Sequence, residues 1–521
     1  MVDNRSPDRA WTEDIQAVTR APDLQVPFQA CILDTPPDPC TVVIVGASGD
    51  LTARKILPAL YSLYRNGGVP EAFSVVGCAR TPMGDNAFRE RMRKAVQERS
   101  DWDEAAWESF AGCLFYRTVD YEDPETFQRL AEDLRDLDKT QGTRGNRVFY
   151  LSIPPTLYPS TARMIGASGL SREGADGNGW SRIVVEKPFG RDLDSAEALD
   201  RVLHEHFEEH QIFRIDHYLA KETVQSILMF RFANAIFEPI WNRSYIETAH
   251  ITAAETLGVE HRAGYYEQAG VLRDMFQNHM MQLMALTAMD PPSQFETDMV
   301  RDEKVRVYRS LRPFPVDRIW DDLILGQYGA GTLDGKRVPA YRDEKGVRPD
   351  SLTPTFASMK VFLDNWRWQG VPFHLTSGKR LAQKLTEIRL RFKEVPHSLF
   401  RETLGEHIAA NDLILGIYPE EKITLTFQTK NPGARLCLRS VTMDFHYHQD
   451  YSGPVLEAYE KVLLDCMLGD QMLFWRQDGV ELCWAFLTPI LEQCETCGER
   501  SDLLFPYDAG TWGPKPSKKL T

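Results

Sequence analysis

Several features are scarce in this chain of 521 residues, and each scarcity excludes a class of protein. No run of 18 or more apolar residues occurs, so we expect no transmembrane helix. Basic residues are also few: the chain has 60 lysines and arginines and 75 acidic residues, which gives a net charge of −15. This charge argues against nucleic-acid binding, and an anionic substrate would need a local cluster of cations. Internal repeats and low-complexity segments are missing.

Cysteine is thinly spread. Nine cysteines at wide spacing do not match the disulfide framework of a secreted protein. Cys494 and Cys497 form a CxxC pair without a second pair or histidines at zinc-binding spacing, so we predict no metal site. Two thiols near a loop on the solvent side are the favoured interpretation, and a redox role is the alternative. The first 35 residues lack a basic start followed by an apolar core, so the cytoplasm is the expected location.

The chain has the composition of a globular protein, with 43% hydrophobic residues, and enough length for two to four domains. Residues 1–37 are polar and contain prolines, which predicts a mobile arm with a short helix at 10–19. Over 38–212, strand and helix patterns alternate, which is typical of βαβ units and a parallel sheet. Over 213–521, long helices mix with alternating strands, which predicts a larger α+β domain with a mostly antiparallel sheet.

The expected elements can be given by residue number. In the first domain, strands are predicted at 41–45, 73–77, 147–153 and 182–185. In the second domain, we predict helices at 222–242 and 265–290, strands at 245–253, 385–392 and 412–428, and an irregular tail after 505.

A glycine-containing loop follows the first predicted strand and precedes an amphipathic helix. Its residues are Gly46, Ala47, Ser48, Gly49, Asp50 and Leu51. The first glycine allows a tight turn, the second lets the backbone approach a ligand, and the helix N-terminus offers free N–H groups to a pyrophosphate. Because the spacing is G-x-x-G and not G-x-G-x-x-G, a plain strand–turn–helix stays as the alternative.

The end of the second predicted strand indicates which nucleotide binds. Enzymes that use NAD place an acidic residue there, whereas this strand is followed by Arg80. A carboxylate repels a 2′-phosphate and an arginine attracts it, so Arg80, with help from Lys55, favours NADP. A solvated surface arginine is the alternative.

Two polar motifs follow the predicted parallel strands. Lys187, in EKPFG, comes directly after the strand at 182–185, at the edge where parallel sheets bind ligands. An ion pair with Glu186 is the alternative. Further on, RIDHYLAKE contains Asp216, His217, Tyr218 and Lys221. If this segment is helical, His217 and Lys221 share a face and can hold one phosphate. A solvated helix start is the alternative there.

A histidine late in the chain completes the candidate chemistry. His279 lies on the helix predicted at 265–290, where the ordinary interpretation is a half-buried structural histidine with its hydrogen bonds made. Asp274 is five positions earlier, about 140° around a helix, and is therefore not expected to pair with it. If His279 is a base, its orienting carboxylate must come from elsewhere.

Four segments together resemble the glucose-6-phosphate dehydrogenase family: GASGDLTARKILPALYSL, EKPFG, RIDHYLAKE and RDMFQNHMMQ. The resemblance runs from about residue 40 to the C-terminus. It implies a Rossmann-like coenzyme domain, followed by a β+α domain whose sheet forms the contact of a homodimer or homotetramer. It also implies oxidation of glucose 6-phosphate at C1 with NADP, to 6-phosphogluconolactone, the first step of the oxidative pentose phosphate pathway.

The resemblance further implies a role for each matching residue. His279 would be the base and Asp216 its orienting partner. The substrate would be held by Lys187, His217, Tyr218, Lys221, Glu255, Asp274, Lys379 and Lys384. The coenzyme would contact Gly46, Ala47, Ser48, Gly49, Asp50, Leu51, Lys55, Arg80, Pro155, Tyr158 and Lys187.

The sequence departs from the family pattern in two places. Ala220 replaces a glycine that is common in RIDHYLGKE, which matters only if that residue is not helical. Some members bind a second, structural NADP through basic residues, and here Leu385, Gly416 and Thr426 stand at such places, so we do not expect that site.

Other functions remain open at this point. A sugar oxidoreductase of the Gfo/Idh/MocA type shares a Rossmann domain and an EKP lysine, but leaves RIDHYLAKE and His279 unexplained. A catalytically inactive NADP sensor would have no use for the complete set of Asp216, His279, Lys187 and Lys221. A hexose-phosphate dehydrogenase of the endoplasmic reticulum fused to a lactonase is disfavoured by length.

Overall fold

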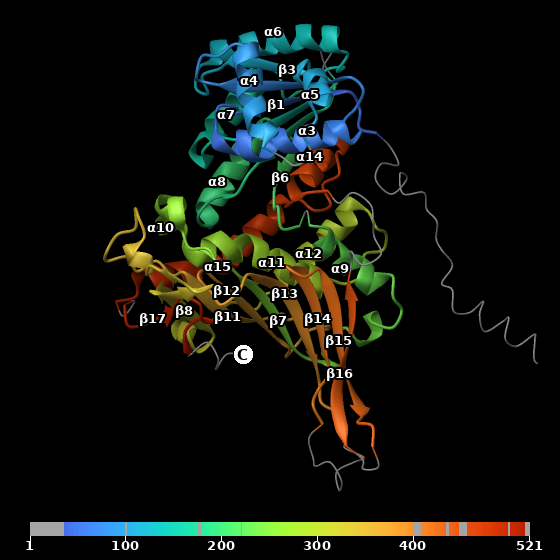
Figure 1. The fold of residues 1–521 in the computed structure, drawn as a ribbon, viewed down its shortest axis with the longest axis vertical. Coiled ribbons are helices and arrows are strands. Elements are labelled where there is room, and N and C mark those ends of the chain that lie inside the picture. The colour runs from blue at the N-terminus through green and yellow to red at the C-terminus, as the bar shows by residue number, and fades with distance from the viewer. Residues whose placement is uncertain are drawn as a thin grey trace, which may run out of the picture.

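The computed structural model describes residues 36–98, 102–174, 179–219, 221–397, 399, 408–433, 437–446, 456–498 and 501–515. The helix predicted at 10–19 and nearly all of the predicted arm lie outside these residues. Two large sheets organise the described chain, one of six strands and one of nine, and Figure 1 shows them with a layer of helices between them. A small third sheet pairs β9 (Gly331–Leu333) with β10 (Lys336–Val338). No described helix has the length and apolar character needed to cross a membrane.

The six-stranded sheet is parallel throughout, with the order β3-β2-β1-β4-β5-β6 of a doubly wound dinucleotide-binding fold. Its strands are β1 (Cys40–Val45), β2 (Phe73–Ala79), β3 (Leu114–Thr118), β4 (Arg147–Leu151), β5 (Ser181–Val185) and β6 (Ile212–Arg214). Its central strands are buried on both faces, which explains their β-branched composition. The predicted Rossmann-like fold is confirmed.

Helices cover both faces of this sheet. The turn η1 (Thr52–Ile56) and helices α3 (Leu57–Arg65), α4 (Asp85–Gln97) and α5 (Glu104–Ala111) pack on one face. Helices α6 (Pro124–Gln141), α7 (Tyr158–Ala167) and α8 (Leu193–His204) pack on the other.

The nine-stranded sheet has the order β16-β15-β14-β13-β7-β12-β11-β8-β17. Its strands are β7 (Ile246–Ala254), β8 (Leu323–Gly329), β11 (Phe356–Phe362), β12 (Pro372–Gly378), β13 (Leu385–Phe392), β14 (Asp412–Tyr418), β15 (Lys422–Lys430), β16 (Leu438–His446) and β17 (Leu504–Asp508). All neighbouring pairs are antiparallel except β12 with β7 and β17 with β8. The prediction of a mostly antiparallel sheet is confirmed.

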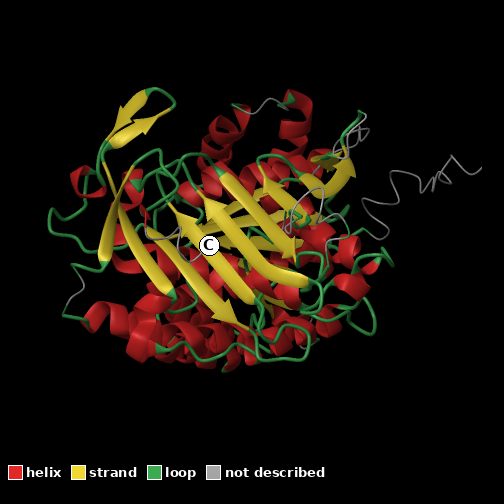
Figure 2. Ribbon diagram, turned by 90° about the horizontal axis from the view of Figure 1, so that it is seen from below, coloured by secondary structure: helices red, strands yellow, loops and turns green. Residues whose placement is uncertain are grey.

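The helices of this second part cover one face of its sheet. They are α9 (Glu222–Phe232), α10 (Ala263–Val271), η6 (Leu272–Met280), α11 (Met281–Ala288), α12 (Thr297–Arg309) and α15 (Gln477–Thr496). Figure 2 views the molecule from the side that these helices leave open, so the strands lie in front. Helix α14 (Ala458–Leu468) packs instead against α3 of the first part.

Two predicted helices differ from those observed. The helix predicted at 222–242 ends at Phe232, because the Asn234 amide donates to the Phe230 carbonyl and Pro239 cannot continue a helix. The helix predicted at 265–290 consists of α10, η6 and α11. Gly270 interrupts it with φ 60° and ψ 177°, and η6 is wound as a π-helix.

Predictions for the last third of the chain were partly wrong. The strand predicted at 412–428 is a hairpin of β14 and β15, since Pro419 lacks the N–H that would continue the ladder. The tail expected to be irregular after 505 contributes to β17, which pairs in parallel with β8. Cys494 is buried on α15 and is not a solvent-side thiol, because its side of the helix faces the core.

The turn after β1 requires glycine at position 46. Gly46 has φ +98°, and a Cβ added there would lie 2.1 Å from the carbonyl oxygen of Ser152, which follows β4. The two central strands therefore approach closely at the edge of the sheet where the candidate coenzyme loop begins.

We predict that Gly46→Ala destabilises the protein much more than Gly67→Ala. Gly67 also has positive φ, +71°, but an added Cβ meets nothing within 4 Å. Gly67→Ala should cost only the left-handed strain, about 1 kcal/mol, and Gly46→Ala about 3 kcal/mol or more, because the clash adds to the strain. Thermal unfolding of both variants measures the difference, and equal losses would contradict the close approach.

Candidate active site

The loop after β1 has the form of a phosphate site. Gly49 donates its N–H to the Gly46 carbonyl at 2.9 Å, which closes the turn. Ser48 and Gly49 are half-buried, whereas Asp50 is exposed and pairs with Arg54 at 2.7 Å. The remaining predicted contacts are the buried Ala47, the half-buried Leu51 and the exposed Lys55. The first turn of a helix has N–H groups without intrahelical acceptors, which can donate to phosphate oxygens.

Arg80 follows β2 directly and is exposed. Its guanidinium lies 5.5 Å from the centre of the Tyr121 ring, and no ion pair joins it to a carboxylate of the described chain. The guanidinium is thus available to an anion beside the loop.

The loop after β4 reaches the boundary between the two sheets. Pro155 lines a cleft of about 790 Å³, together with Pro188 and Tyr265. Tyr158 is only 1% exposed, with its hydroxyl against the backbone of Glu186, so its contact with a coenzyme stays a prediction.

Three side chains from distant segments meet at the carboxyl edge of the six-stranded sheet. Asp216 follows β6, Lys187 follows β5, and His279 lies on η6. The Nδ1 atom of His279 is 2.6 Å from Oδ1 of Asp216, and its Nε2 atom is 2.9 Å from Nζ of Lys187. The carboxylate that orients His279 therefore comes from outside its own helix, as expected. Lys187 contacts His279 and does not pair with Glu186, which was the alternative interpretation.

These contacts assign the proton on His279. A lysine ammonium can only donate, so Nε2 of His279 is the acceptor. The ring proton is therefore on Nδ1, where the Asp216 carboxylate accepts it. Lys187 also donates to the carbonyl of Asp274 at 3.0 Å and lies 3.3 Å from Oδ1 of the same residue. The lone pair on Nε2 of His279 points toward the Lys187 ammonium.

Burial and neighbouring charges set the protonation of this group. Burial lowers the pKa of His279, although the Asp216 charge opposes that shift. Burial alone would raise the pKa of Asp216, but the charge and hydrogen bond of His279 lower it to about 2. Burial would also raise the pKa of Asp274, but the charges of Lys187 and Lys379 hold it well below its usual value. The site therefore holds a neutral imidazole between ionised carboxylates.

The residues after Asp216 form a turn, so the condition on which His217 and Lys221 would share a helical face is not met. Helix α9 begins only at Glu222, because the Tyr218 N–H donates to the Asp216 carboxylate at 2.9 Å and closes the turn. The turn nevertheless brings these side chains together. The Tyr218 ring stacks on His279 at 4.0 Å, and the His217 ring lies 5.1 Å from it. Ala220 lies outside the described residues.

A second group of cations lies beside this turn. The Lys221 ammonium is 4.5 Å from the Tyr218 ring and 5.3 Å from the Tyr418 ring. Lys384 lies 4.1 Å above the same Tyr418 ring. Burial and the charge of Lys384 lower the pKa of Lys221. Two ammonium groups thus share one aromatic residue, Tyr418, which the sequence analysis missed.

Lys379 is a further cation of the site. It follows β12, and its ammonium bonds Oε2 of Glu255 at 2.5 Å, from the end of the neighbouring β7. The sequence analysis also missed Tyr265, whose hydroxyl donates to Asp274 at 3.3 Å. No motif singles out either tyrosine, because each reaches the site only through the fold of its own segment.

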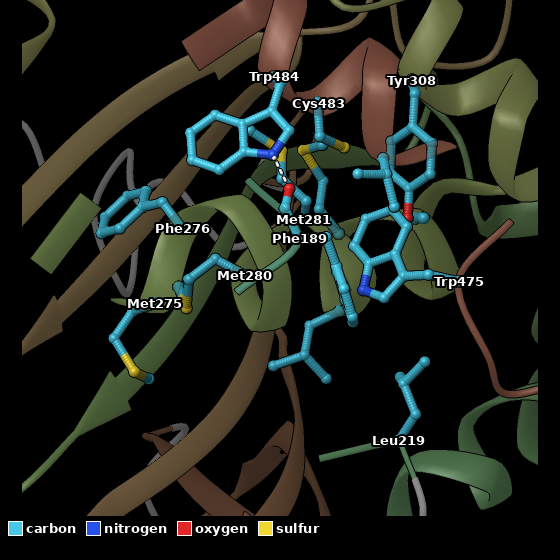
Figure 3. Packing of buried hydrophobic residues seen from close by; sticks show 14 of the residues in the cluster. Phe189, Leu219, Met275, Phe276, Met280, Met281, Tyr308, Trp475, Cys483 and Trp484 are labelled. Atoms are coloured by element: carbon cyan, nitrogen blue, oxygen red, sulfur yellow. Dashed lines mark hydrogen bonds between the residues drawn. The ribbon is translucent and has the colours of Figure 1, made fainter. Parts of the chain in front are cut away.

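The apolar side of η6 fixes the position of His279. Met275, Phe276 and Met280 are buried there, and Figure 3 shows them beside Trp475 and Trp484. The Trp475 indole N–H donates to Asn278, and the Trp484 indole N–H donates to the Phe189 carbonyl at 2.8 Å, which holds the loop of Lys187 (Figure 3).

Asp216, His217 and His279 offer atoms within 4.8 Å of one another, close enough to hold a metal ion. The Lys187 ammonium lies directly against His279, however, and repels a second cation. The arrangement favours proton transfer.

Comparison with known proteins agrees with this geometry. The model of the glucose-6-phosphate dehydrogenase NAD-binding domain matches residues 43–226, and the model of the C-terminal domain of the same enzymes matches 228–521. The chain belongs to the glucose-6-phosphate dehydrogenase family.

Curated relatives carry the same family name. The glucose-6-phosphate 1-dehydrogenase of Aggregatibacter actinomycetemcomitans is 46% identical, over 92% of this chain and 95% of its own. That of Bacillus subtilis is 42% identical, over 92% and 96%. A solved glucose-6-phosphate dehydrogenase in complex with its substrate glucose-6-phosphate has a TM-score of 0.85 at 32% identity, covering 93% of this chain and 98% of that one.

The direction of the His279 pKa shift gives a prediction. Only neutral His279 accepts a proton, and its lowered pKa keeps it neutral until the pH falls below the usual histidine value of about 6.5. The acid limb of kcat should therefore lie below pH 6.5. Asp216→Asn removes the charge that opposes the shift, so the limb should move further toward acid while kcat falls. A limb that moves toward higher pH in this variant would contradict the pairing.

Proposed function

We infer that this chain is a glucose-6-phosphate 1-dehydrogenase, which oxidises D-glucose 6-phosphate at C1 to 6-phospho-D-glucono-1,5-lactone with NADP, the first step of the oxidative pentose phosphate pathway. The observation that carries the inference is the buried group of His279, Asp216 and Lys187 beside the cations Lys221 and Lys384. Family membership, and a similar solved enzyme bound to this substrate, support it.

His279 acts as the general base. When substrate binds, the C1 hydroxyl takes the place of the Lys187 ammonium at the Nε2 lone pair, which then accepts the hydroxyl proton. The Asp216 carboxylate stabilises the imidazolium that forms. Because the carboxylate already accepts the Nδ1 proton, the ring is held in the reactive tautomer before substrate binds. Lys187 donates a hydrogen bond to the sugar and stabilises negative charge on the reacting oxygen.

The cations away from the dyad hold the phosphate. Lys221 and Lys384 supply the positive charge that a phosphate needs in a protein of net charge −15. Burial lowers the pKa of His217 to about 3, so its ring N–H and the Tyr218 hydroxyl are neutral donors. Asp274, Glu255 and Lys379 position the sugar hydroxyls, with Lys379 also close to the phosphate. Fixing both ends of the sugar holds C1 against the base.

The loop after β1 fits NADP. The turn at Gly46 leads into a helix N-terminus whose free N–H groups suit a pyrophosphate, and the exposed guanidinium of Arg80 suits a 2′-phosphate. NADP held by this loop would supply a nicotinamide as the acceptor for the hydride from C1 of the sugar. Pro155, Tyr158 and Lys187 are proposed contacts at that end.

The alternatives explain less. A Gfo/Idh/MocA-type oxidoreductase does not account for matches to both glucose-6-phosphate dehydrogenase domain models. An inactive NADP sensor does not account for the assembled His279, Asp216 and Lys187.

We also propose that the protein forms a homodimer or homotetramer through the open face of its nine-stranded sheet. The edge strand β16 supports this, because Met443 and Phe445 are 64% and 59% exposed there. Sedimentation of the purified protein tests it. The division into a coenzyme domain at 38–212 and a substrate and oligomerisation domain at 213–521, and location in the cytoplasm, stay predictions.

The activity is tested by the formation of NADPH at 340 nm from glucose 6-phosphate and from free glucose. Turnover should require the phosphate, and His279→Asn should lower kcat by about 10²–10⁴-fold, the usual contribution of a positioned base. The KM for glucose 6-phosphate should change little. Equal turnover of both sugars would favour the Gfo/Idh/MocA alternative, and unchanged kcat would remove His279 from the mechanism.

The coenzyme preference is tested at Arg80. Arg80→Gln removes the charge that faces the 2′-phosphate, so the KM for NADP should rise by about tenfold or more, the contribution of one charge-assisted hydrogen bond. The KM for NAD should stay within about twofold, since NAD lacks this phosphate. A matched control is Arg54→Gln, which removes an exposed charge paired with Asp50. Equal weakening of both coenzymes would assign Arg80 to folding.

A further inference from the structure

Glu186, which precedes Lys187, is held by two phenols from distant parts of the chain. Tyr150, in β4, donates to Oε1 of Glu186 at 2.6 Å, and Tyr459, at the start of α14, donates to the same oxygen at 3.2 Å. Burial and the charge of Glu186 raise the pKa of both phenols, so both keep their protons and act as donors. The carboxylate of Glu186 is therefore fixed from two sides.

Helix α14 (Ala458–Leu468) comes late in the chain but packs on the coenzyme-binding part. Figure 1 shows it beside α3, and its apolar residues belong to the same core as those of α3. At its other end, Arg182 of β5 donates to the carbonyls of Cys466 and Met467 at 2.7 and 2.6 Å. These contacts at both ends fix where Tyr459 lies.

We propose that Tyr459 is a positioning residue for the coenzyme side of the active site: its hydroxyl, with that of Tyr150, holds Glu186 and thereby the loop that presents Lys187. The proposal rests on the role proposed above for Lys187. It gives α14 a function at the active site. Among the described residues, no side chain of α14 hydrogen-bonds to His279 or Asp216, and Tyr459 acts through Glu186.

The loop of Lys187 is held at both of its ends. Glu186 precedes the lysine and is bonded to Tyr459, whereas Phe189 follows it and accepts from Trp484 of α15 at 2.8 Å. Two helices from the C-terminal part of the chain thus fix one short loop of the other part. Loss of the Tyr459 bond leaves Glu186 held by Tyr150 alone, and so loosens one end of the loop, while the Lys187 ammonium stays bonded to Asp274 and His279.

The charges around Glu186 add an electrostatic effect. Burial raises the pKa of Glu186, and the two phenol hydrogen bonds and the Lys187 charge oppose this, while Asp216 adds to it. Tyr158 also faces Glu186, from α7. Losing the Tyr459 bond should raise the pKa of Glu186 further. As the pH falls, the carboxylate would then take up a proton, and lose its attraction for the Lys187 ammonium, at a higher pH than in the wild type.

The test is Tyr459→Phe, which keeps the ring and removes only the hydroxyl. We expect the KM for NADP to rise about five- to tenfold, the usual effect of losing a hydrogen bond to a charged group. The KM for glucose 6-phosphate should rise by no more than about twofold, because Lys221, Lys384 and Lys379 still hold that substrate when Lys187 is less well placed. The acid limb of kcat/KM for NADP should move to higher pH. In the Glu186→Gln background the same substitution should add little, because the hydroxyl acts only through Glu186.

Tyr61→Phe is the matched control, because the Tyr61 hydroxyl bonds the Asp103 carbonyl at 2.9 Å in the same core, away from Lys187. It should leave both KM values unchanged. The proposal is overturned if Tyr459→Phe lowers only the thermal midpoint, raises both KM values equally, or has its full effect in the Glu186→Gln background. Wild-type turnover and the His279→Asn loss, measured in the same assay, separate failure of this proposal from failure of the proposed function.

Discussion

The hydrogen bond between His279 and Asp216 is the contact on which the rest of the site depends. It joins a π-wound helix to the end of β6, 63 positions apart in the chain, at 2.6 Å. A buried imidazole without this partner would lack both a fixed tautomer and a counter-charge for its protonated form. The sheets, the apolar side of η6 and the loop of Lys187 all act to hold these two groups together.

Local charge explains how an acidic protein can take an anionic substrate. The net charge is −15, yet Lys187, Lys221, Lys379 and Lys384 gather around the turn after β6. The carboxylates Asp274 and Glu255 each engage one of these lysines, whereas Lys221 and Lys384 share only an aromatic residue, Tyr418. Within the described residues, neither Lys221 nor Lys384 forms an ion pair, and these are the two cations proposed to bind the phosphate.

The sequence predicts the parallel sheet well because β-branched runs, glycine stops and helical periodicity are local signals. Local signals also singled out Gly46 and Lys187, whereas the roles of Asp216 and His279 came from the resemblance to the family and not from the local pattern. Tyr418 and Tyr459 could not be found this way, since each reaches the site through a hairpin or a late helix that only the tertiary fold brings near. The sequence could not decide whether 217–219 is helical, because the bond from the Tyr218 N–H to the Asp216 side chain, which makes a turn there, competes with helical spacing.

The most direct test of the central claim is a crystal structure of the His279→Asn variant with glucose 6-phosphate and NADP bound. The account predicts that the C1 hydroxyl lies within hydrogen-bond distance of residue 279, which still contacts Asp216, and that the phosphate lies between Lys221 and Lys384. A sugar bound with C1 turned away from residue 279, or a phosphate held elsewhere, would contradict it.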